Sequence, residues 1–469
     1  MPIKILNSLT QEKEEFTPLE KGVVKMYVCG PTVYDDPHIG HLRSAYAFEV
    51  MRRYLQSSFG GYKVTFVRNV TDIDDKIIDK ARQSGATDLV QASQEVAKTY
   101  FESYKRDLLR FGLSEPTHEP KATENLQEMH DLIRRLIEKG AAYPSGGDVY
   151  FDVEKFPAYG KLSHQDREAM KDTVEKNSKK QSALDFALWK GVKEGEPNWP
   201  SPWGAGRPGW HIECSAMSIK HLGETFDIHG GGRDLIFPHH ENEVAQSEAA
   251  TGKAFARFWV HHGLLTVQSQ KMSKSLKNFI TLDQVLREDP NYGDEVLKLT
   301  FLGTHYTAPL DYTAERVKMD RAVWKRFLEF FDNARAAEKN GAEVAEKHIG
   351  RIYTAFREAM DNDFNTPEVL AAMHALVNET YKKNDPIALV TAAAAIRNFG
   401  AEVFGVVFDQ TETSCELKPE IEKAITERQA ARKNKDFNKA DEIRRLLLKD
   451  KNVELRDLSD GRTTWRMKL

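Results

Sequence analysis

The chain has 469 residues, 40% hydrophobic and 29% charged, so it can bury cores for two to four domains. Its net charge of −4 does not mark the whole chain as a nucleic-acid binder, and three widely spaced cysteines argue against a disulfide framework. The first residues lack the apolar run of a signal peptide, and no run of about 18 apolar residues is expected to cross a membrane. This composition favours a cytoplasmic protein without a membrane partner.

Charge is unevenly distributed along the chain. Residues 416–469 contain 15 Lys or Arg against 11 Asp or Glu, a net charge of +4 that leaves −8 on the rest. A basic tail on an acidic body indicates an anionic partner at the C-terminal end, although a solvated helical surface is the more common explanation of such a pattern.

The N-terminal part alternates strand and helix patterns. Residues 23–28 predict a short strand that ends at Cys29, and residues 42–55 predict a helix. Residues 63–68 predict a second strand, so we expect a parallel βαβ unit. Three acids within 72–75 follow this strand. We interpret them as capping and solvated loop residues rather than as metal ligands.

The predicted helix opens with Pro37-His38-Ile39-Gly40-His41. In an open α/β sheet, ligands bind in the crevice at the carboxyl ends of the strands, where this turn is expected. A helix N-terminus there offers unpaired N–H groups and a partial positive charge, which suit phosphate. His38 and His41 are three residues apart and project from nearly one side of this first turn.

A different pattern interrupts this alternation in the middle of the chain. Residues 88–140 carry long helical patterns, residues 148–152 predict a strand, and residues 160–200 are polar and charged. We interpret residues 115–205 as an insertion between the two halves of a nucleotide-binding fold.

Two later segments carry residue types that bind metals. Trp210 and Cys214 are four residues apart after a Gly- and Pro-rich loop, so they share a helix face. His239 and Glu243 have the same spacing, which selects His239 over His240 as the partner of Glu243. From spacing alone, a lone cysteine is more often a small buried hydrophobe, and a His–Glu pair is more often an exposed helix pair.

Between these segments, a strand pattern at 226–229 runs into Gly230, Gly231 and Gly232. The glycines fit a tight, flexible turn or a close approach to adenine or ribose. Asp234 follows, as a turn acid or as a pocket residue.

The remaining segments are mostly helical. Lys271-Met272-Ser273-Lys274-Ser275 is polar, lacks an apolar period and predicts a mobile loop. Residues 297–406 predict a helix bundle, and residues 409–413 a short linker. The last module is predicted as two helices and two short strands, at 417–434, 436–450, 453–455 and 463–466.

Two of these peptides together indicate a family. His38-Ile39-Gly40-His41 resembles the HIGH signature of class I aminoacyl-tRNA synthetases, and Lys271-Met272-Ser273-Lys274-Ser275 resembles their KMSKS signature. They occur in the family's order, over 200 residues apart. The flanking residues narrow the resemblance to cysteinyl-tRNA synthetases, over the whole chain. One departure is Lys277, where the family often has glycine.

The resemblance implies an α/β fold with four parts. These are a Rossmann-like catalytic domain with a parallel sheet, a connective insertion, an α-helical bundle that binds tRNA, and a small mixed α/β anticodon-binding module. The corresponding segments are 1–114 with 206–310 for the catalytic domain, 115–205 for the insertion, 311–408 for the bundle and 416–469 for the last module.

The resemblance also implies one Zn²⁺ per chain, because the family's zinc ligands align with Cys29, Cys214, His239 and Glu243. Thiolate and imidazole suit zinc, and an oxygen ligand is acceptable. Cysteine and serine differ by one atom, and shape discriminates weakly between near-isosteres. Zinc favours a thiolate, so the implied role of the ion is to recognise the substrate's sulfur without an editing domain.

The implied activity is formation of cysteinyl-adenylate from L-cysteine and ATP, followed by transfer to the terminal ribose of tRNA(Cys). His38 and His41 would donate to the phosphates, and Lys271 and Lys274 would reach the triphosphate when their loop closes. Mg²⁺ is expected with ATP, without a dedicated protein cage. The other implied contacts are Gly40, Gly230, Gly231 and Gly232 for ATP, and Thr71, Trp210 and Asp234 for cysteine.

The tRNA contacts are the least specified. Trp465 would stack on a base and Arg462 or Arg466 would contact phosphate or base edges, but Trp465 is explained equally well by the module's own core. We expect a monomer. A ligase that passes activated cysteine to an amino-sugar is one rival, and residues 416–469 argue against it. The other is a non-catalytic tRNA-binding paralogue, and the intact signatures argue against that.

Overall fold

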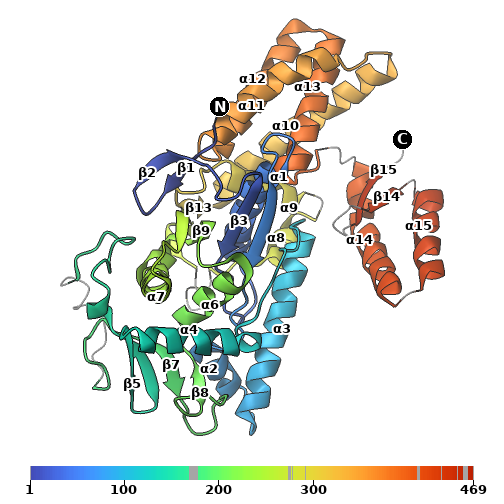
Figure 1. Ribbon diagram of the computed structural model, residues 1–469. Coiled ribbons are helices and arrows are strands. Elements are labelled where there is room, and N and C mark those ends of the chain that lie inside the picture. Colours follow the sequence, from blue (N-terminus) through green and yellow to red (C-terminus); the bar gives the residue numbers. More distant parts are fainter. Residues whose placement is uncertain are drawn as a thin grey trace.

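The computed structural model describes residues 2–467 except 168–177, 273–275, 277, 291, 409–411, 435, 452 and 458–462. A four-stranded parallel sheet forms the centre of the molecule, in the order β4–β3–β9–β10 (Figure 1). Its strands are β3 (Val23–Val28), β4 (Lys63–Arg68), β9 (Phe226–Gly232) and β10 (Ala256–His262). The parallel sheet expected from the first βαβ unit is confirmed.

Two βαβ units build this sheet from its middle outward. β3 leads through α1 (Ile39–Gln56) into β4, and β9 leads through α7 (Glu241–Thr251) into β10. β3 and β9 are neighbours, with Val28 paired to Gly230. The chain therefore leaves these two strands toward opposite edges of the sheet. Such a switch point is where open α/β sheets form their ligand crevice.

Helix α1 begins at Ile39, three residues before the predicted start, because the His38 side chain caps its N-terminus. Phe48 and Leu55 are completely buried. The helix is buried on most of its surface because it packs in one hydrophobic core with residues of the sheet and of the later helices.

The insertion carries its own antiparallel sheet, at the lower end of the body in Figure 1. Helix α4 (Leu126–Glu138) shares a hydrophobic core with this sheet, through residues such as Ile133. The sheet extends to Pro208, three residues beyond the expected end of the insertion at 205, because the last strand pairs with its neighbour. The strands are β5 (Ala142–Ser145), β6 (Asp148–Phe151), β7 (Phe186–Gly191) and β8 (Gly206–Pro208).

The second catalytic half continues after this sheet with α6 (Trp210–Leu222). A small three-stranded sheet follows β10, in the order β12–β11–β13. The segment that was expected to be a mobile loop therefore starts as a strand at Lys271. The elements of this region are β11 (Leu265–Val267), β12 (Gln270–Lys271), α8 (Leu282–Glu288), α9 (Gly293–Leu302) and β13 (Leu310–Tyr312).

Long helices form the bundle at the top of Figure 1. By length and composition, its span Pro386–Phe404 is apolar enough to cross a membrane, which the sequence expectation missed, but 56% of the span is buried. Its contacts with α10, α11 and α12 are those of a core helix in a bundle. The elements are α10 (Ala314–Lys339), α11 (Glu346–Asp361), α12 (Thr366–Lys383), α13 (Pro386–Phe399) and the π-helical turn η5 (Gly400–Phe404).

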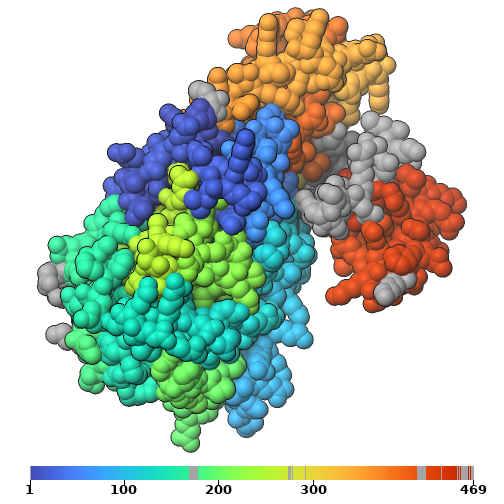
Figure 2. All heavy atoms as spheres, viewed as in Figure 1, coloured from blue at the N-terminus to red at the C-terminus, as the bar shows by residue number. Residues whose placement is uncertain are grey.

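The C-terminal module stands out from the body in Figure 2. Its core contains Ile421, Leu447, Val453 and Leu455, and Trp465 packs against this core while remaining partly exposed. The elements are α14 (Glu412–Lys433), α15 (Phe437–Lys451), β14 (Val453–Asp457) and β15 (Thr463–Met467).

Of the three acids that follow β4, Asp72 and Asp74 are loop and capping residues, as we interpreted them, whereas Asp75 begins α2 and forms ion pairs with Lys190 and Arg207. Asp74 accepts a hydrogen bond from the backbone N–H of Lys76 and caps α2, and Asp72 accepts from the hydroxyl of Thr123. The remaining elements are β1 (Lys4–Asn7), β2 (Glu12–Glu15), α2 (Asp75–Gln83), α3 (Leu89–Arg110), and the short helical turns η1 (Ala122–Glu124), η2 (Val153–Lys155), η3 (Arg233–Leu235) and η4 (Ile236–His240).

Candidate metal centre and active site

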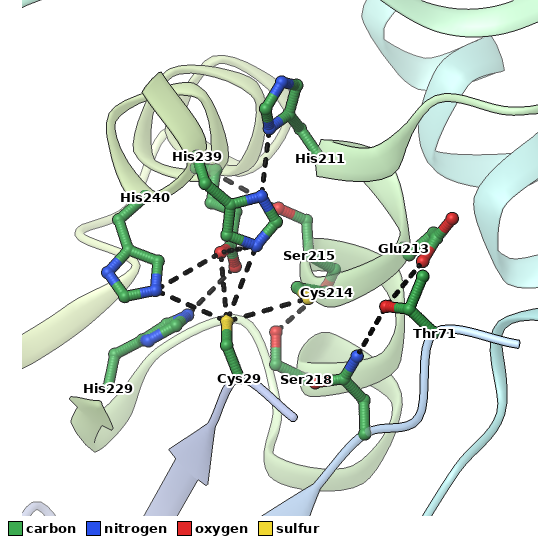
Figure 3. A network of polar contacts seen from close by, with 12 residues as sticks. Cys29, Thr71, His211, Glu213, Cys214, Ser215, Ser218, His229, His239 and His240 are labelled. Carbon is green, nitrogen blue, oxygen red and sulfur yellow. Dashed lines mark hydrogen bonds and ion pairs between the residues drawn. The ribbon is translucent and has the colours of Figure 1, made fainter. Parts of the chain in front are cut away.

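Four side chains from three distant segments meet at the switch point (Figure 3). Cys29 follows β3, Cys214 lies on α6, and His239 and Glu243 flank the start of α7. The Cys29 Sγ atom is 3.7 Å from Cys214 Sγ, 3.5 Å from His239 Nε2 and 3.5 Å from Glu243 Oε1. His239 Nε2 and Glu243 Oε1 are 3.0 Å apart. The convergence expected from the resemblance is therefore present.

The donor set fits a zinc ion. Zinc bonds of about 2.0–2.3 Å at a tetrahedral angle place neighbouring donors about 3.3–3.8 Å apart. The measured separations of 3.0–3.7 Å lie close to this range. Cys214, His239 and Glu243 are at most 1% exposed, whereas Cys29 is only half-buried. Three of the donors are therefore closed off from solvent, and Cys29 is the donor nearest to it.

The ring of His239 is held so that its Nε2 atom faces the other donors. The indole of Trp210 stacks on it, with centroids 4.1 Å apart and planes inclined by 25°. Its Nδ1 atom lies 3.0 Å from Nδ1 of His211. Such outer contacts orient metal-binding imidazoles in proteins. Trp210, expected in the cysteine pocket, thus supports a candidate ligand, and His211 was not identified from the sequence.

Glu243 is held in a similar way. Its Oε2 atom lies 2.9 Å from Nε2 of His229, whose ring stacks on Trp259 at a centroid distance of 4.4 Å. This contact leaves Oε1 facing Cys29. His229 lies on β9, and the alternation of that strand directs it toward Glu243, which the motif spacing could not reveal.

His240 also reaches the cluster, although spacing selected only His239. Its Nε2 atom lies 3.3 Å from Cys29 Sγ and 3.9 Å from Glu243 Oε1. Its Nδ1 atom lies 2.7 Å from Nε2 of His261. Cys29, His229, His240 and Glu243 therefore form a second set with metal-ligand geometry. The helical spacing failed because the chain makes a π-helical turn before α7 begins, so both histidines face inward.

Electrostatics of the cluster favour a cation. Burial raises the pKa of the Cys29 thiol well above its usual value. Burial also raises the pKa of Cys214, but the hydrogen bond from Cys29 and the charge of His239 outweigh it and lower that pKa to about 6. Burial lowers the pKa of His239, but Glu243 and Cys214 outweigh it and raise it to about 10. With Cys214 and Glu243 ionised and His239 and Cys29 protonated, the cluster keeps a net negative charge, and a metal ion displaces such protons when it binds.

His38 and His41 form a reciprocal cap at the start of α1. His38 Nδ1 accepts from the backbone N–H groups of Gly40 and His41, at 3.1 and 3.3 Å. His41 Nδ1 accepts from the backbone N–H of His38, at 3.2 Å. Burial lowers the pKa of both imidazoles, to about 4 for His38 and about 3 for His41. Both rings are therefore neutral near pH 7, and each carries its proton on Nε2.

The second signature lies against the first. A Cβ atom added to Gly40 would lie 3.0 Å from the methyl group of Met272, so these residues are in close contact. The ring of Phe279 meets that of His38 edge-on, with centroids 5.1 Å apart. The Lys271 side chain is exposed on β12. Lys274 and Lys277 fall outside the described residues.

The three glycines are strand residues rather than a flexible turn. Gly230, Gly231 and Gly232 are buried in β9. A Cβ atom at Gly230 would lie 2.4 Å from the ring of Phe48, and one at Gly232 would lie 2.4 Å from a carboxylate oxygen of Asp234. Crowding therefore favours glycine at position 230, where the ring is buried, more than at position 232, where the exposed carboxylate can turn aside. Asp234 itself is exposed, beside the end of β9.

Thr71 lies in a buried polar contact beside Cys214. Its hydroxyl donates to Oε2 of Glu213, at 3.3 Å, and both residues are 1% exposed. Burial raises the pKa of Glu213 well above its usual value. The sequence singled out Thr71 but not Glu213, because an acid between Ile212 and Cys214 carries no motif of its own.

Comparison with known proteins assigns the family. A family model of the class I (C) tRNA synthetase catalytic domain matches residues 15–322. The chain belongs to this class I tRNA synthetase family. A DALR domain model also matches residues 355–409, within the bundle.

Relatives in this synthetase family match the whole chain. It is 47% identical over 495 residues to a cysteine–tRNA ligase of Geobacter sulfurreducens, with 100% of both chains covered. It is 46% identical over 499 residues to one of Geobacter metallireducens, again with 100% of both covered. A cysteine–tRNA ligase of Legionella pneumophila is 45% identical over 474 residues, with 99% of each covered.

Solved structures show the same synthetase fold. The methionyl-tRNA synthetase of Mycobacterium tuberculosis bound by methionyl-adenylate has a TM-score of 0.61 at 13% identity, over 84% of this chain and 92% of that one. A LeuRS in a ternary complex from Agrobacterium radiobacter has a TM-score of 0.60 at 12% identity, over 84% and 85%. At these identities the likeness establishes the fold.

The expected tRNA contacts are only partly described. The Trp465 side chain packs on the core of the C-terminal module, which favours the structural explanation that the sequence left open. Of Arg466, the structure describes the backbone, which pairs with Glu454 in the hairpin. Arg462 falls outside the described residues.

Proposed function

We propose that the chain is a cysteine–tRNA ligase that selects its amino acid with a zinc ion held by Cys29, Cys214, His239 and Glu243. One observation carries this proposal. In a member of this family, four donors at zinc-like separations meet at the switch point, and one of them, Cys29, directly follows the strand that leads to the HIGH turn. A bound zinc would stabilise the thiolate of the substrate and bind serine's hydroxyl poorly.

The chain's own residues would hold the amino acid around this centre. Thr71 adjoins the donor set through its hydrogen bond to Glu213, the neighbour of Cys214. Trp210 adjoins it through the stack of its indole on His239. Asp234 offers a carboxylate at the end of β9, which suits an ammonium group.

The HIGH histidines would act on the phosphates of ATP. The cysteine carboxylate attacks the α-phosphorus, a carboxyl–phosphate bond forms, and the bond to pyrophosphate breaks. The carboxylate has no proton to lose, so no general base is needed. The Nε2–H groups of His38 and His41 would donate to the phosphate oxygens as charge develops. Lys271 and Lys274 would add positive charge, with Mg²⁺ carried by ATP.

The second step would transfer the cysteinyl group to tRNA(Cys). The terminal ribose hydroxyl attacks the carbonyl carbon, the new ester forms, and AMP leaves. Residues 311–408 and 416–469 would bind the tRNA, with Arg462, Trp465 and Arg466 near the anticodon. Gly40, Gly230, Gly231 and Gly232 would lie beside the adenine, ribose or phosphates of ATP. The proposal includes a cytoplasmic location and a monomeric state.

The test combines metal analysis with cysteine-dependent ATP–pyrophosphate exchange. The purified protein is expected to hold about one zinc per chain, held by the four protein donors. Cys214→Ser should lose zinc and lose exchange with cysteine, whereas Cys415→Ser, at the chain's third cysteine, should keep both. Exchange that persists undiminished in the zinc-free protein would refute the zinc mechanism. Absence of any exchange, or transfer to an amino-sugar instead of tRNA, would refute the ligase assignment.

A further inference from the structure

A buried amide belongs to a chain of hydrogen bonds that runs from the residue after Cys29 to the residue before Cys214. Asn69 is the first residue after β4 and is 1% exposed. Its Oδ1 atom accepts from the backbone N–H of Gly30, at 2.9 Å, and its Nδ2 atom donates to the hydroxyl of Thr71, at 3.4 Å. Thr71 in turn bonds to Glu213. One side chain thus connects two segments that are far apart in sequence.

The ends of this chain of contacts adjoin the two cysteines. Gly30 is the residue after Cys29, and Glu213 is the residue before Cys214. Figure 3 shows the Thr71–Glu213 end of the chain beside Cys214. The two cysteines are therefore linked twice, directly by the 3.7 Å contact of their sulfur atoms and indirectly by this chain of hydrogen bonds between their neighbours.

Asn69 is itself rigidly held. The backbone N–H of Val70 donates to the carbonyl of Pro120 at 2.9 Å, and the N–H of Thr71 donates to the carbonyl of Pro31 at 3.3 Å. Gly30 packs so closely that an added Cβ atom would lie 1.7 Å from the carbonyl oxygen of Asn69. The amide therefore has backbone support on two sides and little freedom to move.

We propose that Asn69 is a positioning residue for the cysteine site. It replaces the strand partner that Gly30 loses where β3 leaves the sheet, and so fixes the position of Cys29. It also fixes the rotamer of Thr71 by a hydrogen bond opposite the one to Glu213. This inference rests on the proposed function and assigns to Asn69 the alignment of both thiolates with the amino-acid pocket.

The test compares Asn69→Ala and Asn69→Asp with Asn125→Ala. The aspartate keeps an oxygen for Gly30 but loses the N–H that reaches Thr71. Asn125 is the matched control because it is 3% exposed and bonds to the Lys121 carbonyl and to Lys220, on α6 at a distance from the donor set. The measurements are zinc content, the absorption spectrum of the Co²⁺-loaded protein, and KM for cysteine and for ATP.

Asn69→Ala should lower kcat/KM for cysteine about 10–100-fold, as loss of outer contacts does at metal sites, while KM for ATP stays within about twofold. Its cobalt–thiolate band should shift or weaken. Asn69→Asp should keep that band and still raise KM for cysteine. Asn125→Ala should match the parent in every site measurement.

Outcomes separate this inference from the proposed function. A parent protein with zinc and cysteine-dependent exchange, together with Asn69 variants of unchanged cysteine KM and cobalt spectrum, overturns the role of Asn69 alone. A parent protein without exchange overturns the function. If Asn69→Ala does not fold, Asn69→Asp decides, because an unchanged KM for cysteine in that isosteric variant overturns the link to Thr71.

Discussion

The rings of His38 and His41 stack on each other, with centroids 3.9 Å apart and planes inclined by 12°. Each ring caps the same helix start through its Nδ1 atom, so both Nε2–H groups are left for a ligand. The same two residues therefore cap the helix that carries the signature and provide hydrogen-bond donors for phosphate.

This double role can be separated by substitution at His38. Asparagine is a good N-cap residue but lacks the Nε2–H donor. We expect His38→Asn to keep the thermal midpoint while kcat for adenylate formation falls about 10²–10³-fold. His38→Ala should lose a similar factor in rate and also about 1 kcal/mol of stability. Equal stability of the two variants in thermal unfolding would contradict the capping role.

The packing around Gly40 predicts whether an alanine there stabilises or destabilises the protein. Replacing a helical glycine by alanine ordinarily stabilises a protein by about 0.5–1 kcal/mol. At Gly40 the added Cβ atom would lie 2.8 Å from the His38 ring and 3.0 Å from Met272. We therefore expect Gly40→Ala to destabilise the protein, by about 1–3 kcal/mol, as overpacking does.

Gly350 is the matched control, because it lies inside α11 and an added Cβ atom meets nothing within 4 Å. Gly350→Ala should raise the urea midpoint while Gly40→Ala lowers it. Urea midpoints that rise in both variants would show that the side chains of Met272 and His38 can move aside without loss of stability.

Stability should fall in mild acid because buried histidines must stay neutral. Burial lowers the pKa of His262 to about 4, against 6.5 for the unfolded chain. Below pH 6.5 the unfolded state therefore binds more protons than the folded state, so this contribution is complete above pH 6.5 and is lost as the pH falls toward 4.

The loss for His262 is on the order of 2–3 kcal/mol. We expect His262→Asn to flatten the dependence of the unfolding free energy on pH between 6.5 and 4, measured by urea titration at each pH. A variant with the same slope as the parent would rule out this histidine as a source of the acid sensitivity.

Asp363 joins the bundle to the N-terminal hairpin. It is completely buried and accepts from the backbone N–H of Leu6 at 2.9 Å and from the hydroxyl of Tyr306 at 2.6 Å. Its φ is +68°, which Asn tolerates better than Ala. Asp363→Ala should cost about 3 kcal/mol, because it leaves the buried hydroxyl of Tyr306 and the partly buried N–H of Leu6 without this acceptor.

Two variants make the Asp363 test specific. Asp363→Asn keeps an acceptor oxygen and the backbone preference, so it should cost about 1 kcal/mol. Tyr306→Phe removes one donor and its bond together, with a similar small cost. If Asp363→Ala unfolds at the parent's urea midpoint, the junction is not held by this carboxylate.

The sequence predicted what local spacing and signature peptides encode. The strand before Cys29, the helix after His38 and the first βαβ unit follow from periodicity, and both signatures were visible as short peptides. His239 was selected correctly by its i, i+4 relation to Glu243.

The sequence could not reveal contacts made by tertiary structure. His229 reaches Glu243 from a neighbouring strand, and Asn69 reaches Gly30 across two strand ends. His240 was set aside because a regular helix was assumed where the chain makes a π-helical turn. In each case a side chain's neighbours depend on backbone geometry that residue spacing does not contain.

The junction between β8 and α6 limits how the insertion can be shortened. β8 ends at Pro208 and α6 starts at Trp210, so Gly209 alone separates the insertion's edge strand from the helix that carries Cys214. A Cβ atom at Gly209 would lie 1.9 Å from the carbonyl of Ala187, so this joint presses on β7. We therefore expect a shortened hairpin turn between β5 and β6 to leave the start of α6 in place, whereas truncation at β8 removes the strand that directly precedes α6.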